Sequence, residues 1–441
     1  MRGVRFLILL LIAIPLGWYA YRDSTKRPVD DTPKKDKVFG VEADKIDELE
    51  IKSESGDRTI LKRKGTDWEI VQPVSAPSDQ SAVSGVTSNL SSLEIQRVID
   101  ENPGDLKQFG LASPRVEIAY KSGGQQRRLQ IGDKTPTGSD LYAKLADSKR
   151  VFLIPAYLDS TFNHGTFDLR DKTVLKVDRE QLDKLEVVTG KRTERFEKKN
   201  GDWIIAEPAV GKAEFSAVDN LVSRVSSLQM KSIVSDAADL KKYSLEKPSL
   251  TVRVGSGSSL ATLLIGSTAE SGSVYAKDAV RPAVFTIESS LVDDLKKDVS
   301  EYRLKDLFDA RSFNTTRVEI VRNGQTTTFE KTKTKGKDGK EQEKWRQTAP
   351  STKDVDSSKI ETLISAASAA RATGFVDSTA KTGLDKPELT VAFTYDEGKQ
   401  ERVAFARAGG AAYASRAGSP GAAKIDASTI DSIVKALEDL K

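Results

Sequence analysis

The sequence predicts an α+β fold in which three tandem modules, each an antiparallel sheet with one amphipathic helix, follow a single N-terminal transmembrane helix. Three observations predict it. A tryptophan-containing strand recurs three times, an amphipathic stripe follows each copy in a similar register, and a mostly apolar stretch lies near the start of the chain. A chain of 441 residues is also too long for one ordinary hydrophobic core, so several domains are expected.

The stretch at residues 4–21 holds 18 mostly apolar residues with Arg5 as their one charge, just enough to span a bilayer as a helix. Arg2 precedes it, and aromatic residues that favour the headgroup zone stand at its far end. We therefore expect residues 1–21 to be an uncleaved signal anchor in the cytoplasmic (inner) membrane. The chain would then be single-pass, contacting the bilayer through the stretch, with its C-terminal bulk in the periplasm. A cleaved signal peptide is the alternative, although bulky aromatic residues before Ala20 match a cleavage site poorly.

The rest of the chain divides into a tether and three modules. Residues 22–38 are charged and contain proline without an apolar period, which is typical of a linker. The modules are expected at 39–165, 166–299 and 300–441. The third has diverged and carries a lysine-rich insertion at 331–343, most simply a long solvated hairpin.

The first repeated motif is a tryptophan followed five residues later by a proline. It occurs as "DWEIVQP", "DWIIAEP" and "KWRQTAP". The motif residues are Trp68 and Pro73, Trp203 and Pro208, and Trp345 and Pro350. Because each tryptophan keeps its register with the helix that follows, we expect it to be a core anchor rather than an exposed binding aromatic. The proline is expected to end the strand.

The helix that follows each tryptophan strand carries an apolar stripe with spacings of 3, 4 and 3 residues. The stripe is Val83, Val86, Leu90 and Leu93 in copy one, Val218, Leu221, Val225 and Leu228 in copy two, and Ile360, Leu363, Ala367 and Ala370 in copy three. Residues of N-cap type precede it, and the candidates are Ser78, Asp79, Ser216, Asp356, Ser357 and Ser358.

The second repeated motif is a leucine with a proline three residues later, in "FGLASP", "YSLEKP" and "TGLDKP". Its residues are Leu111 and Pro114, Leu245 and Pro248, and Leu384 and Pro387. We expect a turn that docks onto a core before a strand. Alternating strands follow, with an Ile-Gly pair at 131–132 and 265–266 that copy three lacks. The in-register tyrosines Tyr142, Tyr275 and Tyr413 are expected to pack within the sheet.

The sequence shows no pattern of catalytic, cofactor-binding or metal-binding residues. It contains no cysteine, and the single histidine, His164, cannot make a multi-ligand zinc site. The stretch "GSGSSL" at 255–260 lacks the third glycine of a phosphate cradle, so a hairpin turn is expected. The repeated Glu50, Glu186 and Glu319 are expected on a solvated sheet face rather than as general acids or bases. The net charge of +4 is close to balanced, so the sequence lacks the excess of basic residues that is typical of nucleic-acid-binding proteins.

The order of these motifs resembles a known family. The "DWEI" strand, the "FGLASP" turn and the segment "LRDKTVLKVD" at 169–178, repeated behind one membrane helix, are similar to a bacterial domain-of-unknown-function family encoded beside gliding-motility-type ABC transporters. The resemblance covers roughly residues 39–441. It implies an envelope protein that assists an ABC-type transport complex, and it supplies no catalytic residue.

Three functions follow as hypotheses. The leading one is a non-catalytic, membrane-anchored extracytoplasmic accessory or scaffold protein whose partners are ABC-type transporter subunits. The second is a cell-wall or polysaccharide binder in which tandem weak sites add avidity. The third is an enzyme of unrecognised type. The residues that repeat are apolar, turn and packing residues, and this pattern favours a scaffold or binding role.

Overall fold

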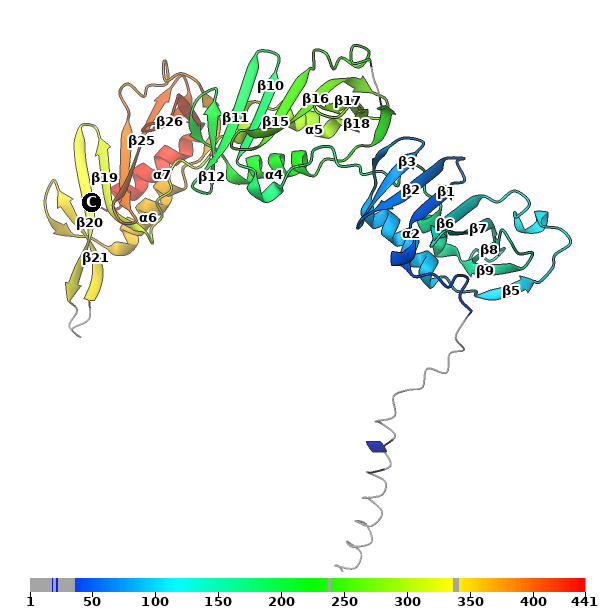
Figure 1. The fold of residues 1–441 in the computed structure, drawn as a ribbon. Coiled ribbons are helices and arrows are strands. Elements are labelled where there is room, and N and C mark those ends of the chain that lie inside the picture. Colours follow the sequence, from blue (N-terminus) through cyan, green and yellow to red (C-terminus); the bar gives the residue numbers. More distant parts are fainter. Residues whose placement is uncertain (1–17, 19–20, 23–35, 237–238, 336–340, 441) are drawn as a thin grey trace, which may run out of the picture. The chain divides into compact units, whose positions relative to one another are not determined.

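The computed structural model describes residues 18, 21–22, 36–236, 239–335 and 341–440. Three nine-stranded antiparallel sheets follow one another along this part of the chain (Figure 1), which confirms the predicted α+β architecture of three modules. We call them modules 1, 2 and 3 in chain order. The predicted membrane segment at 4–21 lies outside the described residues, apart from Trp18 and Tyr21. Within the described ranges, no helix is both long enough and apolar enough to cross a membrane.

Module 1 forms one sheet whose two edges are joined by a helix. Its strands are β1 (Glu48–Lys52), β2 (Arg58–Lys64), β3 (Asp67–Gln72), β4 (Ala76–Pro77), β5 (Arg97–Asp100), β6 (Val116–Ser122), β7 (Gln125–Lys134), β8 (Asp140–Leu145) and β9 (Val151–Pro155). Its helices are α2 (Gln80–Ser92) and α3 (Asp159–Phe162), with 3-10 turns η1 (Ala43–Lys45), η2 (Lys107–Phe109) and η3 (Ala156–Leu158). The strand order is β4-β3-β2-β1-β6-β7-β8-β9-β5, so α2 carries the chain from one edge to the other.

Module 2 repeats this topology. Its strands are β10 (Lys184–Thr189), β11 (Arg192–Lys199), β12 (Asp202–Glu207), β13 (Gly211–Lys212), β14 (Ser232–Ser235), β15 (Leu250–Ser256), β16 (Ser259–Ala269), β17 (Ser273–Asp278) and β18 (Val284–Glu288). Its helices are α4 (Phe215–Ser226) and α5 (Ser289–Leu295), with 3-10 turns η4 (Arg179–Gln181) and η5 (Val299–Tyr302). The order is β13-β12-β11-β10-β15-β16-β17-β18-β14. The "GSGSSL" stretch is the β15–β16 hairpin turn, as predicted.

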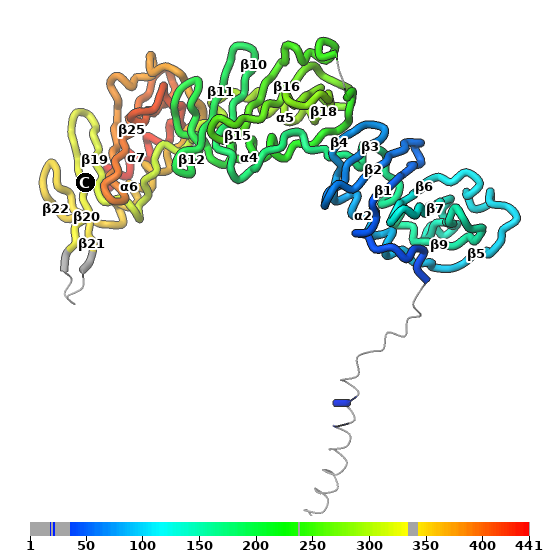
Figure 2. The backbone as a smooth tube through the Cα atoms, in the orientation of Figure 1, coloured from blue at the N-terminus to red at the C-terminus, as the bar shows by residue number. Residues whose placement is uncertain are grey.

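Module 3 has the same sheet and a larger helical layer. Its strands are β19 (Thr315–Arg322), β20 (Gln325–Lys335), β21 (Glu341–Ala349), β22 (Lys353–Asp354), β23 (Ala372–Val376), β24 (Leu389–Tyr395), β25 (Lys399–Ala408), β26 (Ala411–Arg416) and β27 (Ala422–Ile425). The order is β22-β21-β20-β19-β24-β25-β26-β27-β23. The described ends of the lysine-rich insertion, 331–335 and 341–343, belong to the paired strands β20 and β21, which extend beyond the neighbouring strands (Figure 2).

The prediction of one amphipathic helix per module needs correction for module 3. Both α6 (Ser357–Ser368) and α7 (Ala427–Glu438) contain 12 residues and bury an apolar face. The counterparts of α7 in modules 1 and 2 have only 4 and 7 residues. The reason is the helical spacing of Ile430, Ile433 and Leu437, which gives α7 a stripe to bury against the module core.

Each module core lies between the sheet and the helix that joins its edges. In β1, Leu49 and Ile51 are fully buried, whereas Glu50 between them lies on the opposite face, as strand alternation requires. The predicted stripe of α2 packs on this core through Val83 and Leu90. Removing side chains of this size from water stabilises the fold by about 1.5–3 kcal/mol each.

The predicted N-caps are correct for two helices and wrong for one. The Asp79 carboxylate accepts a hydrogen bond from the backbone of α2, and Asp356 does the same for α6. Helix α4, however, begins at Phe215 after Glu214, so Ser216 lies inside the helix. Ser78 instead donates a hydrogen bond to the Trp68 carbonyl oxygen, at 2.7 Å.

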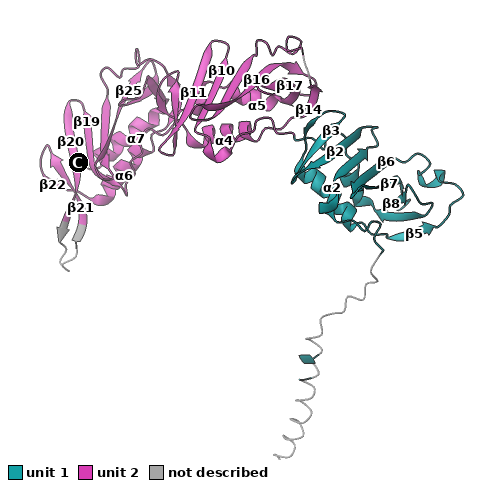
Figure 3. Cartoon of the chain, in the orientation of Figure 1, with its two compact units in different colours: residues 1–171 teal, residues 172–441 magenta. Residues whose placement is uncertain are grey.

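The described chain separates into two compact units, residues 1–171 and 172–441 (Figure 3). The first contains the sheet of module 1 and the second contains the sheets of modules 2 and 3. The predicted module boundaries remain predictions, but the docking of modules 2 and 3 within one unit identifies a junction that the sequence does not predict.

Candidate functional site

The three repeated tryptophans lie in the module cores. Trp68, Trp203 and Trp345 are only 3%, 1% and 2% exposed. A cation from the preceding strand covers each ring, and these are Arg63, Lys198 and Lys331 at 4.7, 5.9 and 5.4 Å from the ring centroids. Each tryptophan also pairs with that cation across the sheet. These positions therefore build the module and do not present an aromatic surface to a ligand.

The repeated prolines follow the tryptophan strands directly. Strands β3, β12 and β21 end at Gln72, Glu207 and Ala349, and the next residue is the motif proline in each copy. All three peptide bonds are cis, namely Gln72–Pro73, Glu207–Pro208 and Ala349–Pro350.

The leucine–proline turn packs on the sheet face opposite the helix in modules 1 and 2. Leu111 is buried there with Phe109 and Val151, and Leu245 is buried with Tyr243 and Val284. The in-register tyrosines contact these two clusters. The ring centroids of Tyr142 and Phe109 are 5.0 Å apart, and those of Tyr275 and Tyr243 are 4.7 Å apart. In module 3, Leu384 is only half-buried and Pro387 is exposed, whereas Pro114 and Pro248 are half-buried.

A glycine permits the turn to approach the sheet. A Cβ atom on Gly132 would lie 2.0 Å from the Phe109 carbonyl oxygen, and one on Gly266 would lie 2.0 Å from the Tyr243 carbonyl oxygen. These contacts explain the Ile-Gly pair that modules 1 and 2 share. Module 3 has Ala406 at this position of β25, next to Phe405.

The repeated glutamates of the opening strands take part in ion pairs, so the expectation of a simply solvated face was wrong. Their side chains are 14–25% exposed, because arginines on the same sheet face lie within reach of each carboxylate. Glu50 accepts from Arg58 and Arg128, Glu186 from Arg195 and Arg253, and Glu319 from Arg317 and Arg402.

Modules 2 and 3 are docked through the segment that connects them. On the module 2 side, the Leu304 backbone N–H donates to the Lys212 carbonyl oxygen at 3.0 Å. On the module 3 side, the Leu307 backbone N–H donates to the Ala370 carbonyl oxygen at 3.1 Å. The connecting segment is therefore hydrogen-bonded to the edge of one module and to the helix end of the next.

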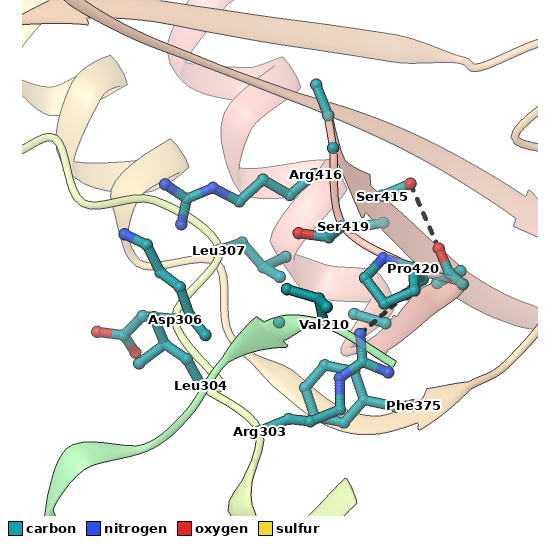
Figure 4. Close-up of a pocket in the computed structure, with 18 of the residues that line it drawn as sticks. Val210, Arg303, Leu304, Asp306, Leu307, Phe375, Ser415, Arg416, Ser419 and Pro420 are labelled. Carbon is teal, nitrogen blue, oxygen red and sulfur yellow. Dashed lines mark hydrogen bonds between the residues drawn. The ribbon is translucent and has the colours of Figure 1, made fainter. Parts of the chain in front are cut away.

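A cavity of about 330 Å³ lies at this junction (Figure 4). Val210 of the β12–β13 turn, Leu304 and Leu307 of the connecting segment, and the β26–β27 hairpin with Ser419 and Pro420 line it. Its volume is at the lower end of the range for small-molecule sites, and domain junctions are preferred places for such sites. We take it as the candidate site of the described chain.

Arg303 closes one side of the cavity. Its guanidinium carbon lies 4.1 Å from the centroid of the Phe375 ring, and its Nη2 donates to the Pro420 carbonyl oxygen at 2.9 Å. Burial lowers the pKa of Arg303, against the opposing effect of the Asp377 carboxylate. This arginine thus ties the connecting segment to the β23 and β26–β27 region of module 3.

A charged network secures the junction beside the cavity. Asp309 accepts hydrogen bonds from Arg416 of β26, at 2.7 Å, and from Lys212 of module 2. Burial alone would raise the pKa of Asp309, but the hydrogen bonds from Arg416 and Lys212 outweigh it and bring the pKa to about 2. Glu401 is buried alongside, accepting from Arg416 at 3.0 Å and from the Ala310 backbone at 2.7 Å.

The polar groups around the cavity mostly hold one module on the other. The guanidinium of Arg303, the Lys212 ammonium and the Asp309 carboxylate are all engaged across the junction. Among the residues that the structure describes, no group of three or more His, Cys, Asp or Glu could hold a metal ion. His164 is half-buried in the loop after α3, away from this junction in sequence and in the other compact unit.

Sequence reasoning missed the junction residues Arg303, Asp309, Glu401 and Arg416. They come from segments that are far apart in the chain, and no local periodicity links them. One signal was available. The connecting segments resemble each other, and Val174 and Leu307 donate to the equivalent Leu228 and Ala370 carbonyl oxygens, a register that places Lys176 in the first segment where Asp309 stands in the second. This charge reversal at a repeated position is the one local feature of the sequence that singles out Asp309.

Comparisons with solved structures give only distant likenesses. A DNA polymerase sliding clamp from Pseudomonas aeruginosa is 8% identical over 87% of this chain and 91% of that chain, with a TM-score of 0.16. A DNA polymerase III subunit beta from the same organism is 8% identical over 86% and 90%, with a TM-score of 0.15. At such TM-scores these likenesses carry no argument. No curated protein matches the chain.

A family comparison is informative. The family described as "Domain of unknown function (DUF4340)" matches residues 68–209 and again residues 203–387. The first match begins at the tryptophan of module 1, and the second begins at the tryptophan of module 2. The two tandem matches agree with a repeated module and together span well over half of the chain. The protein is therefore a member of the family Domain of unknown function (DUF4340).

Proposed function

We propose that the protein is a non-catalytic, membrane-anchored, extracytoplasmic accessory or scaffold protein of an ABC-type transport complex. The observation that carries this proposal is the junction of modules 2 and 3. There, a two-sided backbone connection and the Asp309–Arg416–Lys212 network hold two modules in one body. A fixed pair of modules suits a protein that positions partners, because it presents its surfaces in one arrangement.

Two sequence observations support the membrane and transporter parts of the proposal. The stretch at 4–21 has the length and composition of a signal anchor. The motif order resembles a family encoded beside ABC transporters. The repeated residues add support, since Trp68, Trp203 and Trp345 serve packing and leave the module surfaces to vary among the copies.

Affinity purification of the tagged full-length protein from gently solubilised membranes tests the proposal. We expect ABC-type permease or ATPase subunits among the recovered proteins, identified by mass spectrometry. Their absence, together with retention of the protein on isolated cell-wall polymer, would favour the polysaccharide-binding alternative instead.

The junction offers a matched pair of variants for the same experiment. Asp309→Asn removes the charge that Arg416 and Lys212 share. Asp293→Asn makes the same chemical change at an exposed position of α5. If a fixed pair of modules is needed, the first variant reduces recovery of the partner subunits and the second does not. Equal recovery of the partner subunits with both variants would show that partner binding does not depend on the junction.

A further inference from the structure

We call the sheet face opposite the joining helix the outer face of a module. The outer faces of modules 1 and 2 each contain a buried lysine. Lys144 of β8 is 7% exposed and Lys277 of β17 is 9% exposed. The Lys144 ammonium donates to the Gln130 Oε1 atom at 3.0 Å and to the Leu145 carbonyl oxygen at 2.9 Å. The Lys277 ammonium donates to the Asp278 carbonyl oxygen at 3.0 Å and also to the Arg281 carbonyl oxygen. Burial lowers the pKa of both lysines.

Module 3 has a serine at the equivalent position. Lys144 pairs with Gln130 across the sheet, and Lys277 pairs with Leu264. The corresponding pair in module 3 is Ser415 and Ala404. Two long side chains have been replaced by two short ones on the same face of the sheet.

The backbone that binds the lysine ammonium is retained in module 3. The carbonyl oxygens of Leu145 and Asp278 each accept a hydrogen bond from the backbone three residues later, at 3.1 and 3.2 Å. The Arg416 carbonyl oxygen accepts the same bond from Ser419 at 3.0 Å. The acceptor is therefore present in all three modules, whereas the lysine donor is present only in modules 1 and 2.

The missing side chains leave a groove on module 3. A hollow of about 760 Å³ lies over Ala404 and Ser415, and the 378–385 loop forms one wall, with Asp385 among its lining residues. A second hollow of about 610 Å³ continues along the same face and shares Arg402 with the first. The less deeply seated turn of module 3, in which Leu384 is half-buried, contributes to this opening.

We propose that this groove binds a lysine side chain of a partner protein. The ammonium of that lysine would occupy in module 3 the position that Lys144 and Lys277 occupy in modules 1 and 2. The floor of small side chains makes room for the lysine stem, the Arg416 carbonyl oxygen accepts from the ammonium, and the Asp385 carboxylate on the wall favours a cation.

Nearby cations do not exclude such a ligand. Arg402 is paired with Glu319, and the Arg416 guanidinium is paired with Asp309 and Glu401. Module 1 provides the precedent, because Arg128 on its outer face is paired with Glu50 and Glu117 while Lys144 remains buried close by on the same face. Lys381, also on the groove wall, is exposed to solvent, where its charge is screened.

Titration of the full-length protein in detergent micelles with two blocked tripeptides tests the inference. One is acetyl-Gly-Lys-Gly-amide, and the other has norleucine in place of lysine, which keeps the stem and removes the ammonium. Saturation-transfer NMR reports binding of each peptide. We expect binding of the lysine peptide only, and an affinity about tenfold lower in the Ser415→Lys variant, which supplies the side chain internally.

Two further variants keep the test decisive. Ser415→Ala leaves the space open and is expected to bind as the wild-type protein does. Ala404→Leu places the module 2 residue on the groove floor and is expected to reduce binding even if Ser415→Lys does not fold. Equal binding of both peptides overturns the inference, as does binding that neither filling variant reduces. Failure of n-butylammonium, which has the same stem and ammonium, to compete with the lysine peptide also overturns it.

This inference rests on the proposed function, because the lysine belongs to a docked partner. The two can fail separately. Recovery of transporter subunits without peptide selectivity would reject the lysine groove alone, and peptide selectivity without recovered subunits would reject the transporter assignment alone.

Discussion

The outer faces of module 1 and module 3 show how one fold tolerates two surfaces. In module 1 the turn at Leu111 seats on the sheet over Gly132, and Lys144 fills the adjacent space. In module 3, Ala406 replaces the glycine, Ser415 replaces the lysine, and the turn lies less deeply. The inner faces share the tryptophan, the helix stripe and the strand order, and module 3 adds the longer helix α7 to this core. The inner face has therefore kept and enlarged its core, whereas the outer face of module 3 has lost the side chains that fill it in module 1.

The largest effect should come from the feature that all modules share. Trp68→Ala and Trp345→Ala are each expected to destabilise their own module by about 3–5 kcal/mol, because each removes a buried indole from a core. Hydrogen-exchange mass spectrometry, resolved by module, measures the local loss. A clearly smaller cost for Trp345→Ala would break the comparison, since it would show that the core of module 3 has diverged along with its outer face.

The next effect concerns a position where module 2 departs from module 1. Glu194 lies buried on the core side of β11, where β2 of module 1 has the buried Thr59. Burial of the carboxylate raises the pKa of Glu194 to about 7 from 4.5, with Asp298 adding to the increase and Arg192 opposing it. The folded protein thus holds a proton at pH values where the unfolded chain has released it.

The stability that Glu194 contributes is therefore present below about pH 4.5 and is lost as the pH rises through about 7. Glu194→Gln should remove this dependence and stabilise module 2 at pH 8 by on the order of 2–3 kcal/mol, with little change at pH 4. Exchange protection of module 2 at the two pH values is the measurement, and module 1 is the internal control. A variant with the pH profile of the wild-type protein would contradict the assignment.

The glycine contact gives the third prediction. Gly132→Ala places a Cβ atom 2.0 Å from the Phe109 carbonyl oxygen, so the turn must lift from the sheet. We expect a loss of about 1–3 kcal/mol, the range typical of overpacking, and faster exchange in residues 106–111. The matched change Ala406→Gly in module 3 should cost less than about 1 kcal/mol. Equal effects of the two changes would mean that the glycine does not govern how the turn seats.

The smallest effect is expected for Lys277→Ser, which gives module 2 the residue of module 3. It removes a buried stem and an ammonium donor, while the Asp278 carbonyl oxygen keeps its hydrogen bond from the Arg281 backbone. The cost should be about 1 kcal/mol, because the lost packing is partly offset by relief of a buried charge. Added n-butylammonium should restore part of the lost protection. A lack of rescue would falsify the view that this space is suited to an ammonium group.

The elements and their repetition could be predicted because periodicity is a local signal. Trp68 with the stripe of Val83 and Leu90 shows strand and helix spacing within 25 residues, and two further copies repeat it. Capping was less predictable, because Ser216 and Glu214 are both plausible before α4 and only tertiary packing selects the start. The ion pairs of Glu50 depend on cross-strand register, which residue spacing alone does not give.

The candidate site could not be predicted from the sequence. Its network joins Lys212, Asp309 and Arg416, which meet only when two complete modules dock. The groove of module 3 was partly visible as the absence of the Ile-Gly pair. Its chemistry needed the cross-strand pairing of Ala404 with Ser415, which the structure supplies.

The connecting segments define where one copied unit ends and the next begins. The Asp171 N–H donates to Pro77 of module 1, whereas Lys172 accepts from Met230 of module 2. The later connection divides in the same way. Leu304 donates to Lys212 of module 2, whereas the next residue, Lys305, accepts from Ala372 of module 3. The repeating structural unit therefore starts at the first residues of the connection rather than at the first sheet strand. A gene fragment meant to yield module 2 alone should encode residues 172–304. A start at β10 would omit residues 172–174, which are hydrogen-bonded to residues 228–230 just after helix α4.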